Sequence, residues 1–298
     1  MKIPLSIVIT TYNREMELRR CIESVLEQDY EAYELIIVDD HSTPCYKEQI
    51  IRDFPSVKYV YQEVNSGPGM SRNRGIQEAE HNYVIIMDDD DIFVPKAFDK
   101  INNFLLKNKE LNDPVVHFLC SSTILKEDIE SQNYNFQEYL QGVVSGDTTH
   151  VINKKVFFDQ YNYAFPESRI GAELLLWYQI VVNQGYLIVN DTVVEVREDA
   201  TNRLTNTSWQ ITNAALFAEY QVALIEKFGN EIITVGNLPH LLTKYRGAIT
   251  YSLLAGNRQL AWEYLRRSLT YSKKQLAFLP LFVLPKRMII KLFIRYRQ

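Results

Sequence analysis

The first 120 residues alternate between two hydrophobic periods. Short apolar runs of the kind that forms strands lie at residues 5–9, 35–38, 57–61, 83–87 and 115–119. Leu18 and Ile22 recur at helical spacing, which predicts a helix that Asn13 is placed to cap. Further helices are expected over residues 70–79 and from Pro95 onward. Strands that are apolar on both faces and alternate with helices predict an α/β protein with a mostly parallel sheet covered on each side.

Beyond residue 120 the pattern changes. Residues 121–150 are polar and weakly periodic, which we interpret as an excursion from the sheet, and the core pattern returns in residues 151–158 and in a helical stretch over 171–184. After that the chain becomes helical, with pieces near 208–228, 237–255 and 257–271. We therefore expect a first domain over residues 1–205, which holds the sheet, and a helical C-terminal region over residues 206–298.

Polar residues directly follow three of the predicted strands. They form the segments Thr10–Arg14, Asp39–Ser42 and Asp88–Asp91. In open parallel sheets the ligand lies in the crevice beyond the carboxyl ends of the strands. We therefore expect the three segments to meet in one binding site.

The last of these segments is a run of four aspartates, Asp88 to Asp91. Adjacent carboxylates repel one another unless a cation or solvent relieves the repulsion. Mg²⁺ and Mn²⁺ prefer oxygen ligands and commonly keep water and substrate phosphates in their shell. A solvated acidic turn is the alternative, but the position directly after an apolar strand favours a metal site completed by a diphosphate.

Composition places the protein among ordinary globular chains. Of its 298 residues, 46% are hydrophobic and 23% charged. Three cysteines lie far apart without a CxxC pair, which argues against a disulfide framework or a zinc site and suits a reducing compartment. The sequence shows neither a secretory signal nor an apolar run of roughly 18 residues. We expect a cytoplasmic protein, soluble or peripheral at the inner face of the cell membrane.

The charge is distributed unevenly. The net charge is −5, but the segment from Arg266 to Gln298 carries nine basic residues and no acid, which leaves −14 on the remainder. An acidic body of this kind argues against nucleic acid as a partner. The basic tail is interleaved with apolar residues, as in helices that lie on anionic membranes. The alternative is a helix that docks on the protein body or on another subunit of a homo-oligomer.

Four ordered motifs resemble one protein family. They are Thr10–Arg14, Val38–Ser42, Ser71–Gly75 and Met87–Asp91. Together they are similar to the family 2 glycosyltransferases of GT-A fold, of the bacterial cell-surface polysaccharide type. The resemblance extends from about Pro4 to Asn190. It implies a Rossmann-like, mostly parallel sheet flanked by helices, here with a helical C-terminal extension.

The resemblance also implies roles for individual residues. The residues implied to bind the nucleotide sugar are Thr10, Tyr12, Arg14, Asp39, Arg72, Asp88, Asp89 and Arg197. Asp39 would accept the N3–H of uracil, which favours a UDP-sugar, and Arg72 would contact the base or the diphosphate. Asp88 and Asp90 match the outer positions of a DxD motif, with Asp90 as the direct ligand of Mn²⁺ or Mg²⁺ and Asp88 turned towards the donor. Two alternatives stay open: Tyr12 as a packed aromatic residue and Asp39 as the cap of the following turn.

The catalytic base is implied by a second motif, Gly171–Trp177. The family usually carries an acidic pair before a helix that contains Leu-Trp. Here Glu173 matches the second acid, whereas Ala172 replaces the first. Glu173 is therefore the implied general base, with a purely structural interaction with the helix dipole as the alternative. His150 is placed either to touch the sugar or the acceptor, or to act as a structural histidine.

These roles imply one activity and one competing hypothesis. The activity is the metal-assisted transfer of a sugar, with inversion, from a UDP-sugar to a hydroxyl of a glycan acceptor in surface polysaccharide biosynthesis. We expect this acceptor to be lipid-linked. The competing hypothesis is an inactive nucleotide-sugar-binding or scaffold protein of a polysaccharide assembly complex. Ala172 permits the second hypothesis, whereas the intact aspartate run favours the first.

Overall fold

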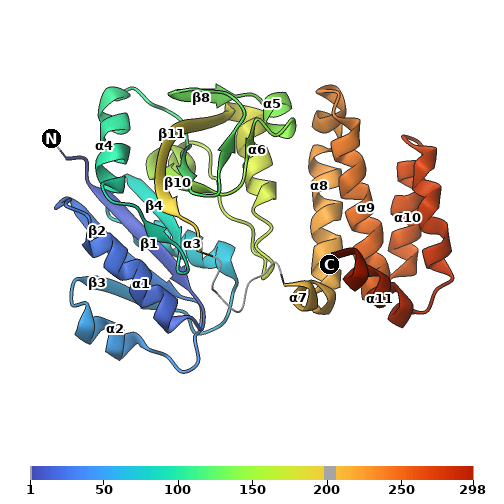
Figure 1. The fold of residues 1–298 in the computed structure, drawn as a ribbon, viewed down its shortest axis with the longest axis horizontal. Helices are drawn as coiled ribbons and strands as arrows, with labels where there is room; N and C mark the ends of the chain where they lie inside the picture. The colour runs from blue at the N-terminus through green and yellow to red at the C-terminus, as the bar shows by residue number, and fades with distance from the viewer. Residues whose placement is uncertain (1, 198–205, 298) are drawn as a thin grey trace. The chain divides into compact units, whose positions relative to one another are not determined.

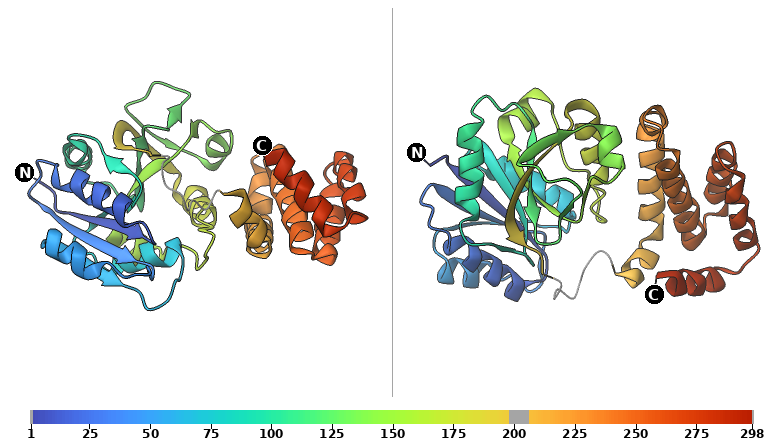
Figure 2. Two further views of the ribbon diagram at one scale, coloured as in Figure 1. Left: turned by 60° about the horizontal axis from the view of Figure 1, so that its bottom comes forward. Right: turned by 45° about the horizontal axis from the view of Figure 1, so that its top comes forward.

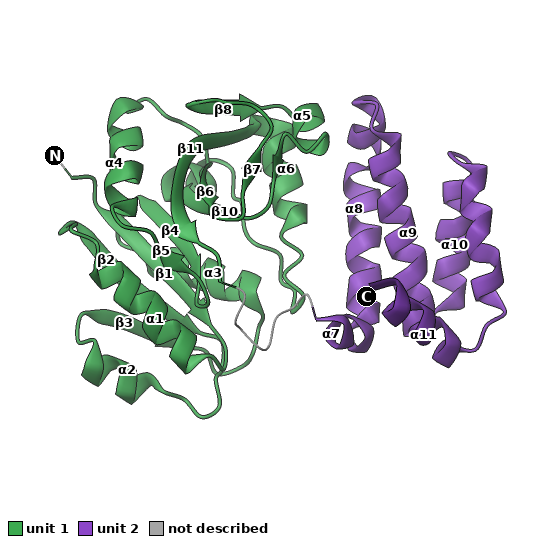
Figure 3. Cartoon of the chain, in the orientation of Figure 1, with its two compact units in different colours: residues 1–200 green, residues 201–298 purple. Residues whose placement is uncertain are grey.

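The computed structural model describes residues 2–197 and 206–297. Two compact units, residues 1–200 and 201–298, divide the chain (Figure 3). The domain boundary expected after residue 205 falls at the end of a segment, 198–205, that lies outside the described residues. Each unit is described by itself below.

The first unit contains a mixed sheet (Figure 1). Its principal strands are β1 (Leu5–Thr11), β2 (Tyr33–Asp39), β3 (Val57–Tyr61), β4 (Tyr83–Asp88), β5 (Ile92–Phe93), β6 (Val115–Cys120), β8 (Ser131–Tyr134), β10 (Thr148–Asn153) and β11 (Tyr186–Glu195). The order is β3-β2-β1-β4-β10-β6-β11-β5, with β8 paired to β11. Strands β3, β2, β1 and β4 are parallel, as predicted, whereas β10 runs antiparallel between β4 and β6. The predicted α/β architecture is confirmed, and the sheet becomes mixed beyond β4.

Helices cover both faces of this sheet, as Figures 1 and 2 show. They are α1 (Glu15–Leu26), α2 (Lys47–Asp53), α3 (Pro68–Glu78), α4 (Ala97–Lys107), α5 (Phe136–Leu140), a π-helical turn (Lys155–Gln160) and α6 (Leu174–Gln184). Alternate residues of each strand point to opposite faces. In β1, Ile7 and Ile9 therefore join the core beneath α1, α2 and α4, whereas Val8 joins the core beneath α3 and α6. A small separate sheet pairs β7 (Ile124–Leu125) with β9 (Val144–Ser145).

Close packing fixes α3 against the sheet. A Cβ atom on Gly75 would lie 2.1 Å from Cγ1 of Val8 in β1, so a side chain at this position cannot be accommodated. The missing side chain lets the helix backbone approach the strand and holds the residues of its first turns at the carboxyl edge of the sheet. Arg72 is one of these residues.

The predicted cap of α1 is wrong. Arg14 is the residue before the helix, and its side chain makes no capping hydrogen bond. Asn13 adopts a positive φ of 55°. Its side-chain oxygen instead accepts a hydrogen bond of 2.7 Å from the backbone N–H of Thr43. This contact joins the loop after β1 to the loop after β2, so the Asn13 side chain stabilises these two loops and does not cap α1.

The second unit is helical. Its elements are α7 (Thr207–Thr212), α8 (Ala214–Thr234), α9 (Leu238–Ala255), α10 (Arg258–Leu269), a 3₁₀ segment η2 (Lys273–Phe282) and α11 (Lys286–Arg297). The helix expected over residues 208–228 is interrupted at Asn213, which separates α7 from α8. The second of these helices, α8, extends further than expected and ends at Thr234. The predicted turn at Gly256–Asn257 between α9 and α10 is confirmed, with Gly256 at a φ of 90°.

One face of α11 packs within its own unit. Ile289 is buried, the Phe293 ring lies 5.9 Å from that of Tyr251, and Arg297 donates to Gln210. Met288 and Leu292, which border this packed face, are 49% and 47% exposed. A docked face and an exposed apolar face therefore occur on the same helix. No helix among residues 2–197 and 206–297 has both the length and the apolar character needed to cross a bilayer.

Candidate active site

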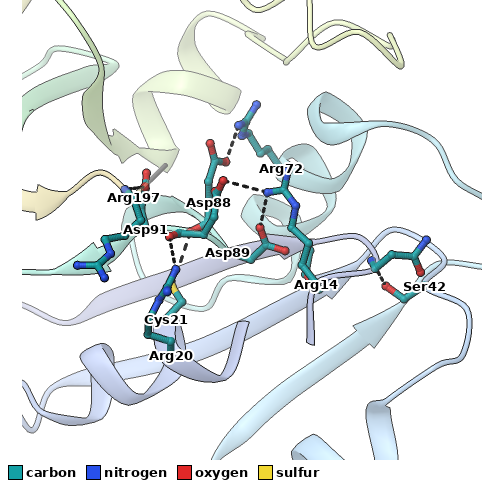
Figure 4. Close-up of polar contacts among 12 residues, drawn as sticks. Arg14, Arg20, Cys21, Ser42, Arg72, Asp88, Asp89, Asp91 and Arg197 are labelled. Atoms are coloured by element: carbon teal, nitrogen blue, oxygen red, sulfur yellow. Dashed lines mark hydrogen bonds and ion pairs between the residues drawn. The ribbon is translucent and has the colours of Figure 1, made fainter. Parts of the chain in front are cut away.

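Strand register brings the three polar segments to one edge of the sheet. In the parallel pairings, Thr10 of β1 lies opposite Asp88 of β4, and Thr11 lies opposite Asp39 of β2. The loops after these strands therefore leave the sheet side by side. Figure 4 shows the aspartate run at this edge with Arg14, Arg20 and Arg72 directed towards it.

Arg72 joins Asp88 to Glu173. One guanidinium nitrogen donates to Oδ1 of Asp88 at 2.7 Å, and the other contacts Oε1 of Glu173. Arg72 is 7% exposed, and its guanidinium lies 5.6 Å from the ring centroid of Phe165. Desolvation disfavours the charge on Asp88, but the neighbouring guanidinium outweighs it and holds the pKa of Asp88 below its usual range. The first residue of the implied DxD motif and the implied base are thus both paired with the guanidinium of Arg72.

Arg14 neutralises the middle of the aspartate run. Its Nη1 lies 2.9 Å from Oδ1 of Asp89 and 3.2 Å from Oδ2 of Asp90. Asp89 is 2% exposed, and burial raises its pKa to about 7 in spite of this pairing. Two residues expected to bind the nucleotide sugar, Arg14 and Asp89, are therefore paired with each other in this structure.

The far end of the run contacts Arg197, which the family resemblance implies, and Arg20, which no sequence pattern singles out. Oδ1 of Asp91 accepts a hydrogen bond of 2.9 Å from the backbone N–H of Arg197, and burial raises the pKa of Asp91 to about 7. Arg20 donates to the carbonyl oxygen of Asp90 at 3.0 Å. Nothing in the sequence distinguishes Arg20 from its neighbour Arg19, which pairs with Glu15. The two arginines differ only in the face of α1 on which they lie.

A backbone hydrogen bond to Asp91 positions Arg197 next to the aspartate run. Its side chain is 40% exposed and pairs with Glu195 at 2.7 Å. Its own backbone N–H binds Asp91, so the guanidinium lies at the rim of the aspartate run. A phosphate contact by Arg197 would require the side chain to leave Glu195.

The other residues expected to bind the nucleotide sugar, Thr10, Tyr12 and Asp39, lie in two different environments. Thr10 is buried beside β4, and Tyr12 is 41% exposed just beyond the end of β1, where an aromatic face is accessible to a base. Asp39 is fully buried. Its two carboxylate oxygens accept hydrogen bonds from the Ser42 N–H at 2.8 Å and the Tyr59 hydroxyl at 2.6 Å. Asp39 thus caps its turn, and contact with a uracil would require that turn to open.

A buried aromatic cluster lies beside the Arg72 bridge. Nδ1 of His150 lies 3.1 Å from Nδ1 of His117, so one ring donates to the other. His117 is stacked on Tyr186 with ring centroids 4.0 Å apart, and Trp177 lies 4.3 Å from His150. Burial, followed by the charge of Arg72, lowers the pKa of His150 to about 3. His150 is therefore neutral near pH 7.

The carboxylates of Asp88 and Asp90 are oxygen donors of the kind that a hard divalent cation prefers. The side chain of Asp88 is half-exposed, whereas that of Asp90 is more enclosed. Across the described ranges 2–197 and 206–297, no three His, Cys, Asp or Glu side chains are grouped so as to hold a metal. The half-exposed Asp88 and the neighbouring Asp90 fit a cation that would take one or two protein carboxylates and complete its shell with phosphate oxygens and water.

Comparisons with known proteins agree with this geometry. Residues 6–158 match the family described as Glycosyl transferase family 2. A GalNAc(5)-diNAcBac-PP-undecaprenol beta-1,3-glucosyltransferase of Campylobacter jejuni is 25% identical over 199 residues, which cover 62% of this chain and 62% of that protein. For three curated relatives, the matched part is 54% to 68% of the relative's own length.

Solved structures share the fold. S. aureus TarS 1-349 in complex with UDP-GlcNAc aligns with a TM-score of 0.58 at 16% identity, over 92% of this chain and 93% of that one. The mannosyltransferase PcManGT from Pyrobaculum calidifontis in complex with GDP-Man and Mn²⁺ aligns with a TM-score of 0.54 at 15% identity, over 98% of this chain and 87% of that one. The family match extends from β1 through the aspartate run to the π-helical turn after β10. This chain therefore belongs to glycosyltransferase family 2.

Proposed function

We propose that the protein transfers a sugar from a UDP-sugar to a hydroxyl group of a glycan acceptor, with inversion at the anomeric carbon. The observation that carries the proposal is the Arg72 bridge between Asp88 and Glu173. It places a carboxylate of the DxD motif and a candidate base on either side of one guanidinium. A donor diphosphate and an acceptor hydroxyl need groups of these two kinds on opposite sides of the reacting carbon.

Glu173 is the proposed general base. It lies at the start of α6 and is 29% exposed. Arg72 contacts Oε1 alone, so Oε2 stays available to accept the proton of an acceptor hydroxyl. As the proton leaves, the hydroxyl oxygen forms a bond to the anomeric carbon while the bond to the diphosphate breaks. One displacement of this kind inverts the anomeric centre and needs no protein nucleophile.

The aspartate run serves the leaving group. Asp90 and Asp88 are the residues that would hold Mn²⁺ or Mg²⁺, and the bound cation would neutralise charge that develops on the diphosphate. Arg72 lies beside Asp88 and adds a fixed positive charge at the same edge. Arg14 balances the remaining carboxylates, so the site need not carry four uncompensated charges.

Uracil is the proposed base of the donor nucleotide. Tyr12 offers an exposed aromatic face at the end of β1. Thr10 and Arg14 flank it in the sequence, and Asp39 lies at the end of the adjacent strand. TarS, which shares the fold, is named as a complex with UDP-GlcNAc. The proposal therefore includes a uracil pocket between the loops after β1 and β2.

The acceptor is proposed to be lipid-linked, and the protein to work at the inner face of the cell membrane. The Campylobacter relative is named for an undecaprenol-linked glycan. The outward face of α11 supplies a surface for this location, since Met288 and Leu292 are half-exposed beside Arg287 and Lys291. Such a mixture of apolar and basic side chains suits an anionic bilayer surface.

A panel of UDP-sugars tests the proposal. The protein is incubated with each UDP-sugar and Mn²⁺, and release of UDP is measured with and without EDTA. We expect metal-dependent hydrolysis of at least one donor. Calorimetry with UDP distinguishes the competing hypothesis, because tight binding without hydrolysis or transfer supports a scaffold protein instead.

A further inference from the structure

The transferred sugar has a defined place in the proposed reaction. Its anomeric carbon lies between the diphosphate, on the side of Asp88, and the acceptor hydroxyl, on the side of Glu173. Arg72 contacts both carboxylates, so the two are separated by one guanidinium group. A further polar group close to Arg72 and Asp88 is therefore close to the sugar.

His150 is such a group. It lies in β10 opposite Ile86 of β4, two residues before Asp88 along that strand. Its ring lies 4.3 Å from that of Trp177, which lies 5.6 Å from the ring of Phe165, and the Arg72 guanidinium lies over that same Phe165 ring. The side chain is partly exposed, in contrast to its partner His117, which is 2% exposed.

The aromatic cluster fixes the orientation of the His150 ring. Nδ1 is engaged by Nδ1 of His117, and the ring packs against Trp177. Nε2 has no hydrogen-bond partner among the residues that the structure describes. The ring is held in place because Nδ1 is paired with His117, and Nε2 remains able to form a hydrogen bond with a ligand. A ligand hydroxyl suits this nitrogen, because a hydroxyl can either donate or accept.

The charges around this space select against an acidic sugar. Asp88 and Glu173 are two carboxylates that share the single cation Arg72. The two terminal guanidinium nitrogens of Arg72 already contact these two carboxylates. A hexuronic acid would add a third carboxylate to this group.

We infer that His150 belongs to the donor-sugar subsite, where Nε2 forms a hydrogen bond with the sugar, and that the sugar is an uncharged hexose or N-acetylhexosamine. The inference rests on the proposed function and adds the class of sugar to it. His117 is a positioning residue, because it holds the His150 ring without reaching the sugar.

Two amide substitutions separate the two ring nitrogens. His150→Asn keeps a polar group near the position of Nδ1, where it can still pair with His117, but removes Nε2. His150→Gln carries its amide further out, towards the position of Nε2. Calorimetry in the presence of Mn²⁺ compares both variants with the wild type. The ligands are UDP, UDP-glucose, UDP-galactose, UDP-N-acetylglucosamine, UDP-N-acetylgalactosamine and UDP-glucuronic acid.

The expected result has three parts. UDP alone binds both variants within about twofold of the wild type, which also shows that they are folded. The preferred uncharged UDP-sugar binds His150→Asn about 3- to 10-fold more weakly, the size of one net hydrogen bond, and His150→Gln recovers most of that loss. The wild type binds UDP-glucuronic acid more weakly than the preferred uncharged donor.

Other outcomes overturn the inference in distinguishable ways. Unchanged sugar-nucleotide affinity in His150→Asn, equal losses in the two variants, or preferred binding of UDP-glucuronic acid removes His150 or the uncharged sugar from the subsite while the proposed function stands. A wild-type protein that binds neither UDP nor any UDP-sugar overturns the proposed function, and the subsite with it.

Discussion

Arg72 donates to Asp88 at 2.7 Å with one guanidinium nitrogen and contacts Glu173 with the other. The planar guanidinium can hold two carboxylates in a fixed relative position, whereas the single ammonium of lysine cannot. The two acids come from β4 and from the start of α6, which lie 85 residues apart in the sequence. Arg72 therefore aligns two halves of the proposed reaction that no backbone hydrogen bond joins directly.

Arg72→Lys should lower kcat/KM about 10- to 100-fold, the effect of losing one charge-assisted hydrogen bond. Steady-state kinetics with the preferred donor measures it. Arg74→Lys is the matched control, because Arg74 lies two residues away on α3 and pairs with Glu78 at the surface. Such exposed pairs contribute little, so this variant should stay within about twofold of the wild type. Equal effects of the two substitutions would contradict the bridge.

Glu173→Gln should reduce turnover at least ~100-fold, the lower range for loss of a general base. UDP affinity should be unchanged, since Glu173 is assigned to the acceptor side. Single-turnover kinetics and calorimetry measure the two quantities separately. Glu130→Gln, at a side chain that is 87% exposed, is the control. Near-full activity of Glu173→Gln would show that another group removes the proton.

Asp90→Ala should abolish metal-dependent turnover and weaken the binding of UDP in the presence of Mn²⁺. In EDTA, the variant and the wild type should bind UDP alike, because the carboxylate is then not bridged to the diphosphate. A titration of activity against Mn²⁺ concentration measures the effect. Wild-type Mn²⁺ dependence in the variant would remove Asp90 from the metal site.

Neutralising the outward face of α11 should weaken binding to anionic vesicles. Each basic residue near such a surface contributes about 1 kcal/mol, so Arg287→Gln, Lys291→Gln and Arg295→Gln together should lower the partition coefficient roughly 100-fold. Co-sedimentation with vesicles of phosphatidylglycerol measures it, with phosphatidylcholine vesicles as the control. Unchanged partitioning, or a change of oligomeric state instead, would favour a protein partner for this face.

Stability of the helical unit should depend on pH through Glu226. The hydrogen bond from Arg267 lowers the pKa of Glu226, and the carboxylate also accepts a hydrogen bond from the Tyr264 hydroxyl at 2.7 Å. A lowered pKa in the folded state adds stability above the unfolded pKa of about 4.3, and this stability is lost as the pH falls below it. Glu226→Gln should therefore lower the free energy of unfolding by about 0.2–1 kcal/mol at pH 7.

The effect of the same substitution should be smaller at pH 3, because the stabilisation from a lowered pKa decreases as the pH falls from the unfolded pKa of about 4.3 through the folded pKa. Denaturant titrations of the two proteins at pH 7 and pH 3 make the comparison. A destabilisation of equal size at both pH values would assign the effect to packing rather than to charge.

The repeating part of the fold could be predicted from the sequence. The apolar runs of β1, β2, β3, β4 and β6 are read directly from the chain, and their parallel order brings the polar segments together. The antiparallel entry of β10 could not be predicted, because the pairing partner of a strand is set by contacts distant in sequence. Asn13 shows the same limit at a loop, since its partner is the backbone of Thr43 and not the nearby helix.

The side-chain pairs within the site also could not be predicted from the sequence motifs. The aspartate run was recognisable, but its distribution among Arg14, Arg72 and Arg20 depends on which helix faces turn towards β4. Likewise the joint position of His117 and His150 follows from their register across β6 and β10. Residue type and spacing along one segment do not encode such cross-strand neighbours.

The antiparallel strand β10 has an evolutionary consequence. It enters the middle of the sheet from a polar, irregular stretch of chain, yet it ends next to the strand that carries the aspartates. Substitutions in that stretch can therefore change the proposed sugar subsite without disturbing the parallel crossover units that carry the proposed nucleotide-binding residues. Selection can therefore change which sugar such an enzyme transfers while the binding of the donor nucleotide is retained.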